Sequence, residues 1–246
     1  MRYFLEVSYR GTRYSGFQSQ KNANTVQAEI QKAFKTIIKK ELELTGSSRT
    51  DAGVHAYQNY FHFDLQKELS SQLVYNLNAI LPADIAVKDL LKVKDNAHCR
   101  FDAISREYKY HIYQKKNPFL TDKAFYFPYT LDIDAMQEAA TAVKEYSDFT
   151  SFSKRKTQVK SFVCDIKESK WVILDGCLVY NVKANRFLRG MVKALTATML
   201  NLGRGKIDLM AFRRIIETKD CTLANFSAPA HGLILTEVCF PDNYFI

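Results

Sequence analysis

The chain has little of what marks several large classes of protein. Its 246 residues include nine glycines and five prolines, too few for a collagen-like or proline-rich chain. No apolar run reaches the roughly 18 residues that a membrane-spanning helix needs, so we expect no association with a membrane. Charged residues appear as early as Arg2 and Glu6, which is not the pattern of a secretory signal peptide.

Cysteine is scarce and unpatterned. No pair of cysteines has the Cys-x-x-Cys spacing of zinc and redox motifs, and no histidine lies at metal-ligand spacing from a cysteine or a glutamate. We therefore expect no metal, no disulfide framework, and reduced cysteines in a cytoplasmic protein. The five cysteines are Cys99, Cys164, Cys177, Cys221 and Cys239.

What the chain does have is an excess of positive charge. Lysine and arginine number 35 and aspartate and glutamate 26, so the net charge is 35 − 26 = +9. This charge favours a polyanionic partner such as nucleic acid, although a merely basic soluble surface would give the same count. The densest basic cluster is Lys154, Arg155 and Lys156, which we take as candidate RNA contacts.

Hydrophobic periodicity predicts the secondary structure, with period two for strands and about 3.6 for helices. Strands are expected at residues 3–10, 56–65, 85–93, 108–112, 159–169, 171–183 and 233–240. Helices are expected at residues 25–40, 70–81, 132–146, 185–202 and 207–218. Asn24 and Gln27 resemble a capping box for the first helix, and Asp175-Gly176 suits a hairpin turn.

Both halves of the chain mix strands with helices, and several strands follow one another as hairpins. This order predicts an α+β fold with a mainly antiparallel sheet. No long Gly/Ser linker separates the halves. We therefore expect two subdomains that share one sheet, at residues 1–104 and 105–246.

The most unusual segment lies at residues 46–56, with the sequence GSSRTDAGVHA. It lacks the Gly-Lys-Ser/Thr ending of a phosphate loop. Arg49 and Asp51 lie among small residues that let a substrate approach the backbone closely. Asp51 can serve there as a nucleophile or a general base, or it can simply order its own turn.

The segment Arg49–His55 resembles the signature of the TruA family of tRNA pseudouridine synthases, in which the aspartate is catalytic. Similar matches follow in order along the whole chain. One position departs from the family pattern, because Lys193 stands where the family usually has arginine. The other matching segments are Tyr14–Gln20, Thr25–Gln27, Asn78–Ile85, Arg106–Tyr110, Asp148–Phe152 and Asn185–Val192.

The resemblance implies the pseudouridine synthase fold, in which two ferredoxin-like halves join a mostly antiparallel sheet, with helices on its faces and an active cleft at the seam. It implies isomerisation of uridine in the anticodon stem-loop of tRNA, at roughly positions 38 to 40, by an enzyme that flips the base out of its stack. It also implies a homodimer and no cofactor, because the reaction involves no redox change and no energy input.

The same resemblance implies roles for particular residues. The Asp51 carboxylate either attacks the ribose C1′ or removes a sugar proton to give a glycal, and the sequence leaves both routes open. Lys193 is the expected charge partner of Asp51, with Arg189 as the competitor one turn earlier on the same predicted helix. Lysine keeps the charge of arginine but loses its planar fork.

Arg49 is expected to enter the RNA stack, with a salt bridge to a loop carboxylate as the alternative. Tyr108 is expected to stack on the target base and to help remove its C5 proton, with an ordinary core tyrosine as the alternative. Tyr110, on the same face, is expected to pack. The resemblance further implies that Gln18 and Gln20 contact the substrate.

The two histidines near the motif, His55 and His62, are possible acids or bases. His62 alternates with apolar residues, so we expect it on a solvated or RNA-facing surface. A second reading of the chain is an RNA-binding paralogue or folding chaperone with little catalysis, which the lysine at position 193 motivates and the presence of Asp51 and Tyr108 disfavours. Charge and the lack of a cofactor motif disfavour a small-molecule isomerase.

Overall fold

A computed structural model describes residues 1–155 and 159–245 of the chain. Lys156, in the predicted basic cluster, lies outside the described residues. The chain divides into two compact units, which we call the first unit (Met1–Ile104 with Ile234–Ile246) and the second unit (Ser105–Leu233). The closing segment thus belongs to the first unit, whereas the predicted division into residues 1–104 and 105–246 assigns it to the second part.

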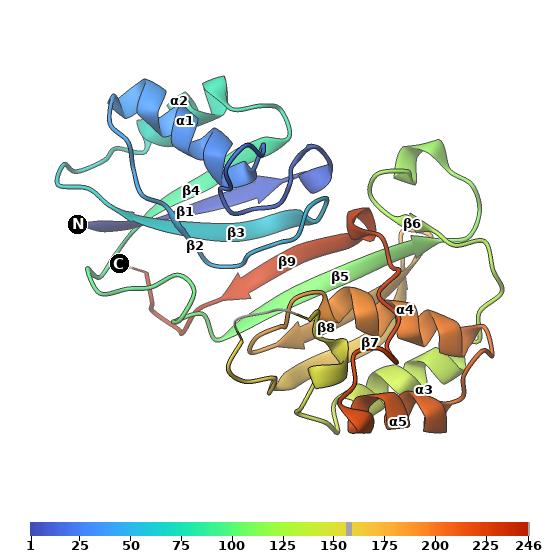
Figure 1. Cartoon of the computed structure of the whole chain (residues 1–246). Coiled ribbons are helices and arrows are strands. Elements are labelled where there is room, and N and C mark those ends of the chain that lie inside the picture. The colour runs from blue at the N-terminus through green and yellow to red at the C-terminus, as the bar shows by residue number, and fades with distance from the viewer. Residues whose placement is uncertain (156–158, 246) are drawn as a thin grey trace. The chain divides into compact units, whose positions relative to one another are not determined.

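The first unit is a sheet with strand order β4-β1-β3-β9 and two helices. β1 pairs antiparallel with both β3 and β4, whereas β3 pairs parallel with β9. Figure 1 shows α1 and α2 lying beside β1 and β4, and the Phe34 ring of α1 meets that of Phe63 on β3 at 5.1 Å between centroids. The elements are β1 (Arg2–Tyr9), η1 (Gly11–Arg13), α1 (Val26–Ile38), β2 (Thr45–Gly46), β3 (His55–Asp64), α2 (Gln72–Ile80), β4 (Ile85–Val93) and β9 (Leu233–Cys239).

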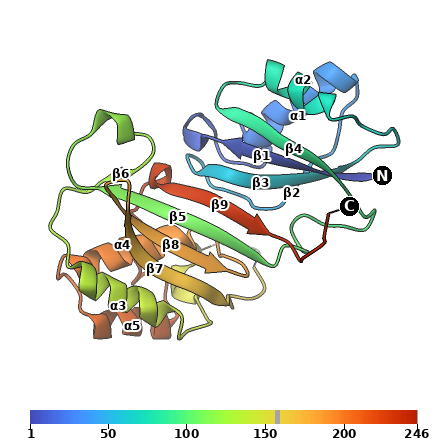
Figure 2. The same ribbon diagram turned by 180° about the vertical axis from the view of Figure 1, so that it is seen from behind.

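The second unit is a sheet with strand order β5-β8-β7, antiparallel throughout, to which β6 adds in parallel beside β5. Figures 1 and 2 show its three helices gathered beside these strands, with α3 against β7 and α4 against β5. The elements are β5 (Ser105–Tyr113), η2 (Pro118–Leu120), β6 (Phe125–Tyr126), α3 (Ile133–Val143), η3 (Thr150–Phe152), β7 (Ile166–Leu174), β8 (Cys177–Ala184), α4 (Met191–Gly203), α5 (Leu209–Thr218) and η4 (Ala230–Gly232).

The predicted fold class is confirmed, because helices and mostly antiparallel strands alternate in the chain. The β7–β8 hairpin turns at Asp175 and Gly176, whose φ values of 50° and 73° are those of a tight hairpin turn. The strand bounds around it are wrong, because one predicted strand, at 171–183, crosses this turn. The strand predicted at 159–169 begins only at Ile166.

Two helix starts also differ from prediction. The first helix is capped by Thr25, whose Oγ1 accepts from the Ala28 amide, so the Asn24–Gln27 capping box is wrong. The helix predicted from residue 185 begins at Met191. Residues 185–190 stay extended or turn-like because the Asn185 and Arg189 carbonyls accept bonds from Arg106 and Lys154, far away in sequence.

Candidate active site

The predicted catalytic loop, residues 47–54, joins β2 to β3. The Ser47 amide donates to the Tyr60 carbonyl at 2.8 Å, and the Val54 amide closes a turn onto the Asp51 carbonyl at 3.2 Å. Within this loop Thr50 is buried, Asp51 is half-buried and Arg49 is exposed. The loop therefore presents two of the predicted site residues from a fixed backbone.

A second segment holds the loop from its other side. The Phe17 amide donates to the Thr50 carbonyl at 3.1 Å, and the Gly53 amide donates to the Tyr14 carbonyl at 3.3 Å. Gly16, between them, has a φ of 108°, and a Cβ added to it would lie 3.1 Å from the Thr50 oxygen. The motifs at Tyr14–Gln20 and Arg49–His55 thus form one local structure that brackets Asp51.

Gln18 and Gln20 follow directly on this segment, and both are exposed. The side-chain Nε2 of Gln20 donates to the Ser15 carbonyl at 3.1 Å. Gln27 of α1 clips the same region together, because its side-chain oxygen accepts from the Ser19 amide and its nitrogen donates to the Leu44 carbonyl. Gln18 and Gln20 are therefore placed on the surface beside the loop that carries Asp51.

The two histidines near the motif are buried. His55 is 4% exposed, and its Nδ1 accepts from the Gly11 amide at 3.0 Å. The expectation that His62 faces solvent or RNA is wrong, because the Cys99 sulfur lies 3.2 Å from its Nδ1 and the His98 ring packs on it at 4.6 Å. Burial lowers the pKa of His62 to about 4.

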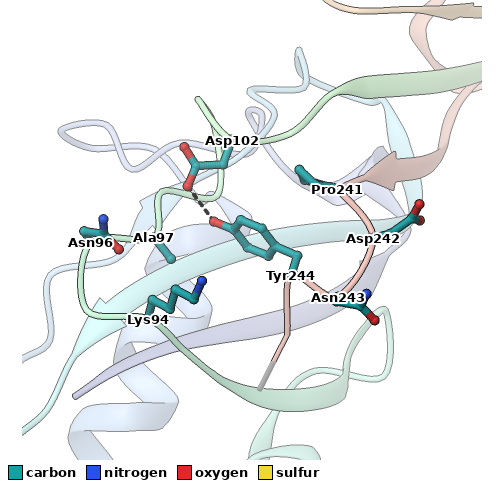
Figure 3. A pocket seen from close by; sticks show the side chains of 8 residues that line it. All are labelled: Lys94, Asn96, Ala97, Asp102, Pro241, Asp242, Asn243 and Tyr244. Carbon is teal, nitrogen blue, oxygen red and sulfur yellow. Dashed lines mark hydrogen bonds between the residues drawn. The ribbon is translucent and has the colours of Figure 1, made fainter.

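A pocket of about 210 Å³ lies in the first unit near the closing segment. In Figure 3 the Tyr244 hydroxyl donates to Asp102 across this pocket, a bond of 2.6 Å. Among the described residues, those that line it include no predicted site residue. They are Lys94, Asn96, Ala97, Asp102, Pro241, Asp242, Asn243 and Tyr244.

Tyr108 lies on β5 in the second unit, opposite Val182 of β8. It is half-buried, and its ring meets that of Phe187 edge to face, with centroids 5.2 Å apart. Tyr110, two residues on, is fully buried and donates its hydroxyl proton to the Pro229 carbonyl at 2.7 Å. The predicted packing role of Tyr110 is confirmed, whereas Tyr108 is only half-buried.

Lys193 occupies the first turn of α4, which begins after Gly190 at a φ of 79°. It is half-buried in a helix whose neighbouring residues are buried. A cation in the first turn interacts unfavourably with the helix dipole and destabilises the helix by about 0.3–1 kcal/mol. Helix stability therefore does not explain this lysine. Arg189 is exposed and precedes the helix, so its predicted place one turn earlier on the same helix is wrong.

The described part of the basic cluster lies beside the start of α4. The Lys154 amide donates to the Arg189 carbonyl at 3.0 Å, and the Lys154 stem would contact any Cβ added at Gly190. Arg155 is exposed and lies 4.0 Å from Asp220. Lys154 is thus placed beside Arg189 and Gly190, directly before the helix whose first turn carries Lys193.

Neither a metal cluster nor a membrane span occurs in the described ranges 1–155 and 159–245. No group of three or more His, Cys, Asp or Glu side chains within them is arranged to hold a metal ion. No helix there has the length and apolar character needed to cross a membrane.

Sequence reasoning missed Asn59, a polar residue in β3 with no exposed surface. Its amide bonds to both backbone groups of Ser48, three residues before Asp51. The signal lay in the alternation of the strand, in which Asn59 takes a place on the face of Phe61 and Phe63.

Comparison with known proteins places these features in a family. The model of the tRNA pseudouridine synthase family matches residues 6–102 and 142–241. A protein of Azobacteroides pseudotrichonymphae named tRNA pseudouridine synthase A is 42% identical over 245 residues, covering 99% of this chain and 98% of the relative. Proteins of the same name from Porphyromonas gingivalis and Staphylococcus aureus are 42% and 37% identical, over 100% and 99% of this chain and 99% and 92% of the relatives.

Proposed function

The chain belongs to the tRNA pseudouridine synthase family, and from this premise we propose that it isomerises uridines in the anticodon stem-loop of tRNA. The protein is an isomerase, a tRNA pseudouridine synthase. The target uridines lie at roughly positions 38 to 40, where a base must leave the stack to expose both of its reacting atoms. Similarity over nearly the full length of relatives named tRNA pseudouridine synthase A carries this proposal.

The chemistry sets clear demands on the site. The bond between C1′ and N1 of the uridine breaks, the base rotates, and C1′ joins C5. The C5 proton leaves and N1 takes up a proton, so the atoms of substrate and product are the same. Asp51 starts the reaction as a carboxylate, either by attack on C1′ or by removal of a sugar proton.

Fixed geometry supports this role for Asp51. Backbone bonds from Phe17 and Gly53 clamp the two sides of the turn that carries it, while its own side chain is only half-buried. A reactive group held in place but open to substrate is what positioning catalysis requires.

Lys193 is the proposed cation that stabilises the Asp51 carboxylate, with Arg189 as the alternative. The location of Lys193 in the first turn of α4 supports this, because the dipole at that end also favours an anion. A lysine gives a point charge here, whereas an arginine would add a bidentate fork.

The remaining predicted residues act on the RNA. Arg49 is proposed to occupy the space that the flipped base leaves, and its exposure supports this. Tyr108 is proposed to stack on the base, and its incomplete burial beside Phe187 supports this role. The side chains proposed to bind the tRNA are those of Gln18, Gln20, Lys154, Arg155, Lys156 and Arg189. The enzyme is proposed to act in the cytoplasm as a homodimer.

Mapping of pseudouridine in unmodified tRNA after incubation with the protein tests the function. We expect product in the anticodon stem-loop with the wild type and none with Asp51→Ala, which should still bind tRNA. Tyr57→Ala is a matched control, because Tyr57 is exposed on β3 and has no proposed role. Absence of product from every tRNA with folded wild-type protein would instead favour an RNA-binding protein without catalysis.

A further inference from the structure

The side chain of Asn59 makes four hydrogen bonds, three of them to backbone groups. Its Oδ1 accepts from the Ser48 amide at 3.2 Å and from the Tyr60 amide at 2.9 Å. Its Nδ2 donates to the Ser48 carbonyl at 2.8 Å and to the Tyr9 hydroxyl at 3.1 Å. All four hydrogen-bonding positions of the amide are therefore filled.

The same network reaches the residue before Asp51. The Tyr9 hydroxyl shares a bond of 2.8 Å with the Thr50 Oγ1, and either hydroxyl can donate it. Tyr9 is 4% exposed and Thr50 is 7% exposed. Asn59 thus bonds to Ser48, and Tyr9 bonds to Thr50. Ser48 and Thr50 are the residues on either side of Arg49.

The position of Asn59 is not one that packing alone would give to a polar side chain. It lies on the strand face of Phe61 and Phe63, where an apolar residue would avoid the cost of burying an amide. The strand is also irregular here, because Val7 pairs with Asn59 but Tyr9 pairs with Ala56. β3 therefore has one residue more than β1 over this stretch, and such bulges re-aim side chains beside active sites.

We propose that Asn59 and Tyr9 are positioning residues, which fix the backbone of the loop so that Arg49 and Asp51 hold their reactive geometry. The proposal rests on the proposed function of Asp51. It assigns to two buried polar groups a role beyond filling the core, because each also bonds to the loop, Asn59 to Ser48 and Tyr9 to Thr50. It follows that loss of these bonds reduces turnover more than it reduces tRNA binding.

Asn59→Ala and Tyr9→Phe test this, with Asn78→Ala as the matched control. The Asn78 amide makes the same pair of backbone bonds, both 2.8 Å, to Val87 of β4. We expect a fall in kcat of about 100-fold for Asn59→Ala, since a misplacement near 1 Å costs about that much. Tyr9→Phe removes one hydroxyl and should lower kcat about tenfold.

The affinity for tRNA and KM should stay within about threefold in both variants, because neither side chain reaches the surface. Asn78→Ala should keep its kcat, and it should lose less thermal stability than Asn59→Ala because Asn78 is exposed whereas Asn59 is fully buried. The two effects on kcat should not be additive, because Asn59 and Tyr9 share one network. Tyr9→Phe keeps the proposal testable if Asn59→Ala does not fold.

Hydrogen exchange separates this proposal from the proposed function. The Ser48 amide should exchange at least about tenfold faster in Asn59→Ala than in the wild type, whether or not the protein isomerises uridine. An inactive wild type with this faster exchange would refute the function and keep the positioning. The positioning proposal would be overturned if Tyr9→Phe keeps the wild-type kcat and Asn59→Ala loses no more kcat than Asn78→Ala does.

Discussion

Replacing Gly16 with alanine should damage the loop that carries Asp51. The φ of Gly16 is 108°, and the new Cβ would lie 3.1 Å from the Thr50 oxygen and 3.6 Å from the Asp51 carbonyl carbon. The backbone conformation costs an L-residue about 1–3 kcal/mol. That loss corresponds to a fall in Tm of about 2–12 °C for a chain of this size.

The contact with Thr50 adds an effect on activity. Relief of a 3.1 Å contact moves the Thr50 carbonyl by tenths of an ångström, and we expect kcat to fall about 10- to 100-fold. Gly176→Ala is the control, because Gly176 has a φ of 73° and no described atom within 4 Å of its added Cβ. Steady-state kinetics and thermal unfolding of both variants decide the matter. Equal kcat in Gly16→Ala and Gly176→Ala would refute the reasoning.

Three further predictions follow from the site and the core. Lys193→Met should lower kcat by about 10- to 160-fold, since a lost charge-assisted pair costs about 1.5–3 kcal/mol, while Lys193→Arg should keep or raise it; full activity of Lys193→Met would refute the proposed pairing. The unfolding free energy should fall by about 3 kcal/mol as the pH drops from 6.5 to about 4, because His62 is protonated at a higher pH in the unfolded chain than in the folded one. If His62→Gln shows the same pH dependence of the unfolding free energy as the wild type, this prediction is contradicted. Tyr110→Phe should lose about 1 kcal/mol of stability and keep its kcat, since it loses only the bond to Pro229. Tyr108→Phe should instead keep its stability and lose kcat, and thermal unfolding and steady-state kinetics measure both variants.

Local signals in the sequence were enough where local interactions decide the structure. β4 has both of its predicted bounds, Ile85 and Val93, because alternation and the preceding turn act within a few residues. The β7–β8 turn follows from the ability of Gly176 to adopt a positive φ. The loop around Asp51 could be predicted because small residues and turn formers interrupt the alternation there.

Prediction failed where distant segments decide. The start of α4 moves to Met191 because Arg106 and Lys154 take the carbonyls of the preceding residues. His62 is buried because residues near Cys99 cover it. The alternation of β3 marks Asn59 as facing inward, but its bonds to Ser48 depend on the path of a loop that periodicity does not give.

Release of tritium from tRNA labelled at C5 of uridine tests the central claim most directly, because joining C5 to C1′ displaces the hydrogen at C5. The account predicts release by the wild type, from sites that then map as pseudouridine, and no release by an Asp51→Ala variant that is folded and still binds tRNA. Release by Asp51→Ala at the wild-type rate would contradict a catalytic role for Asp51.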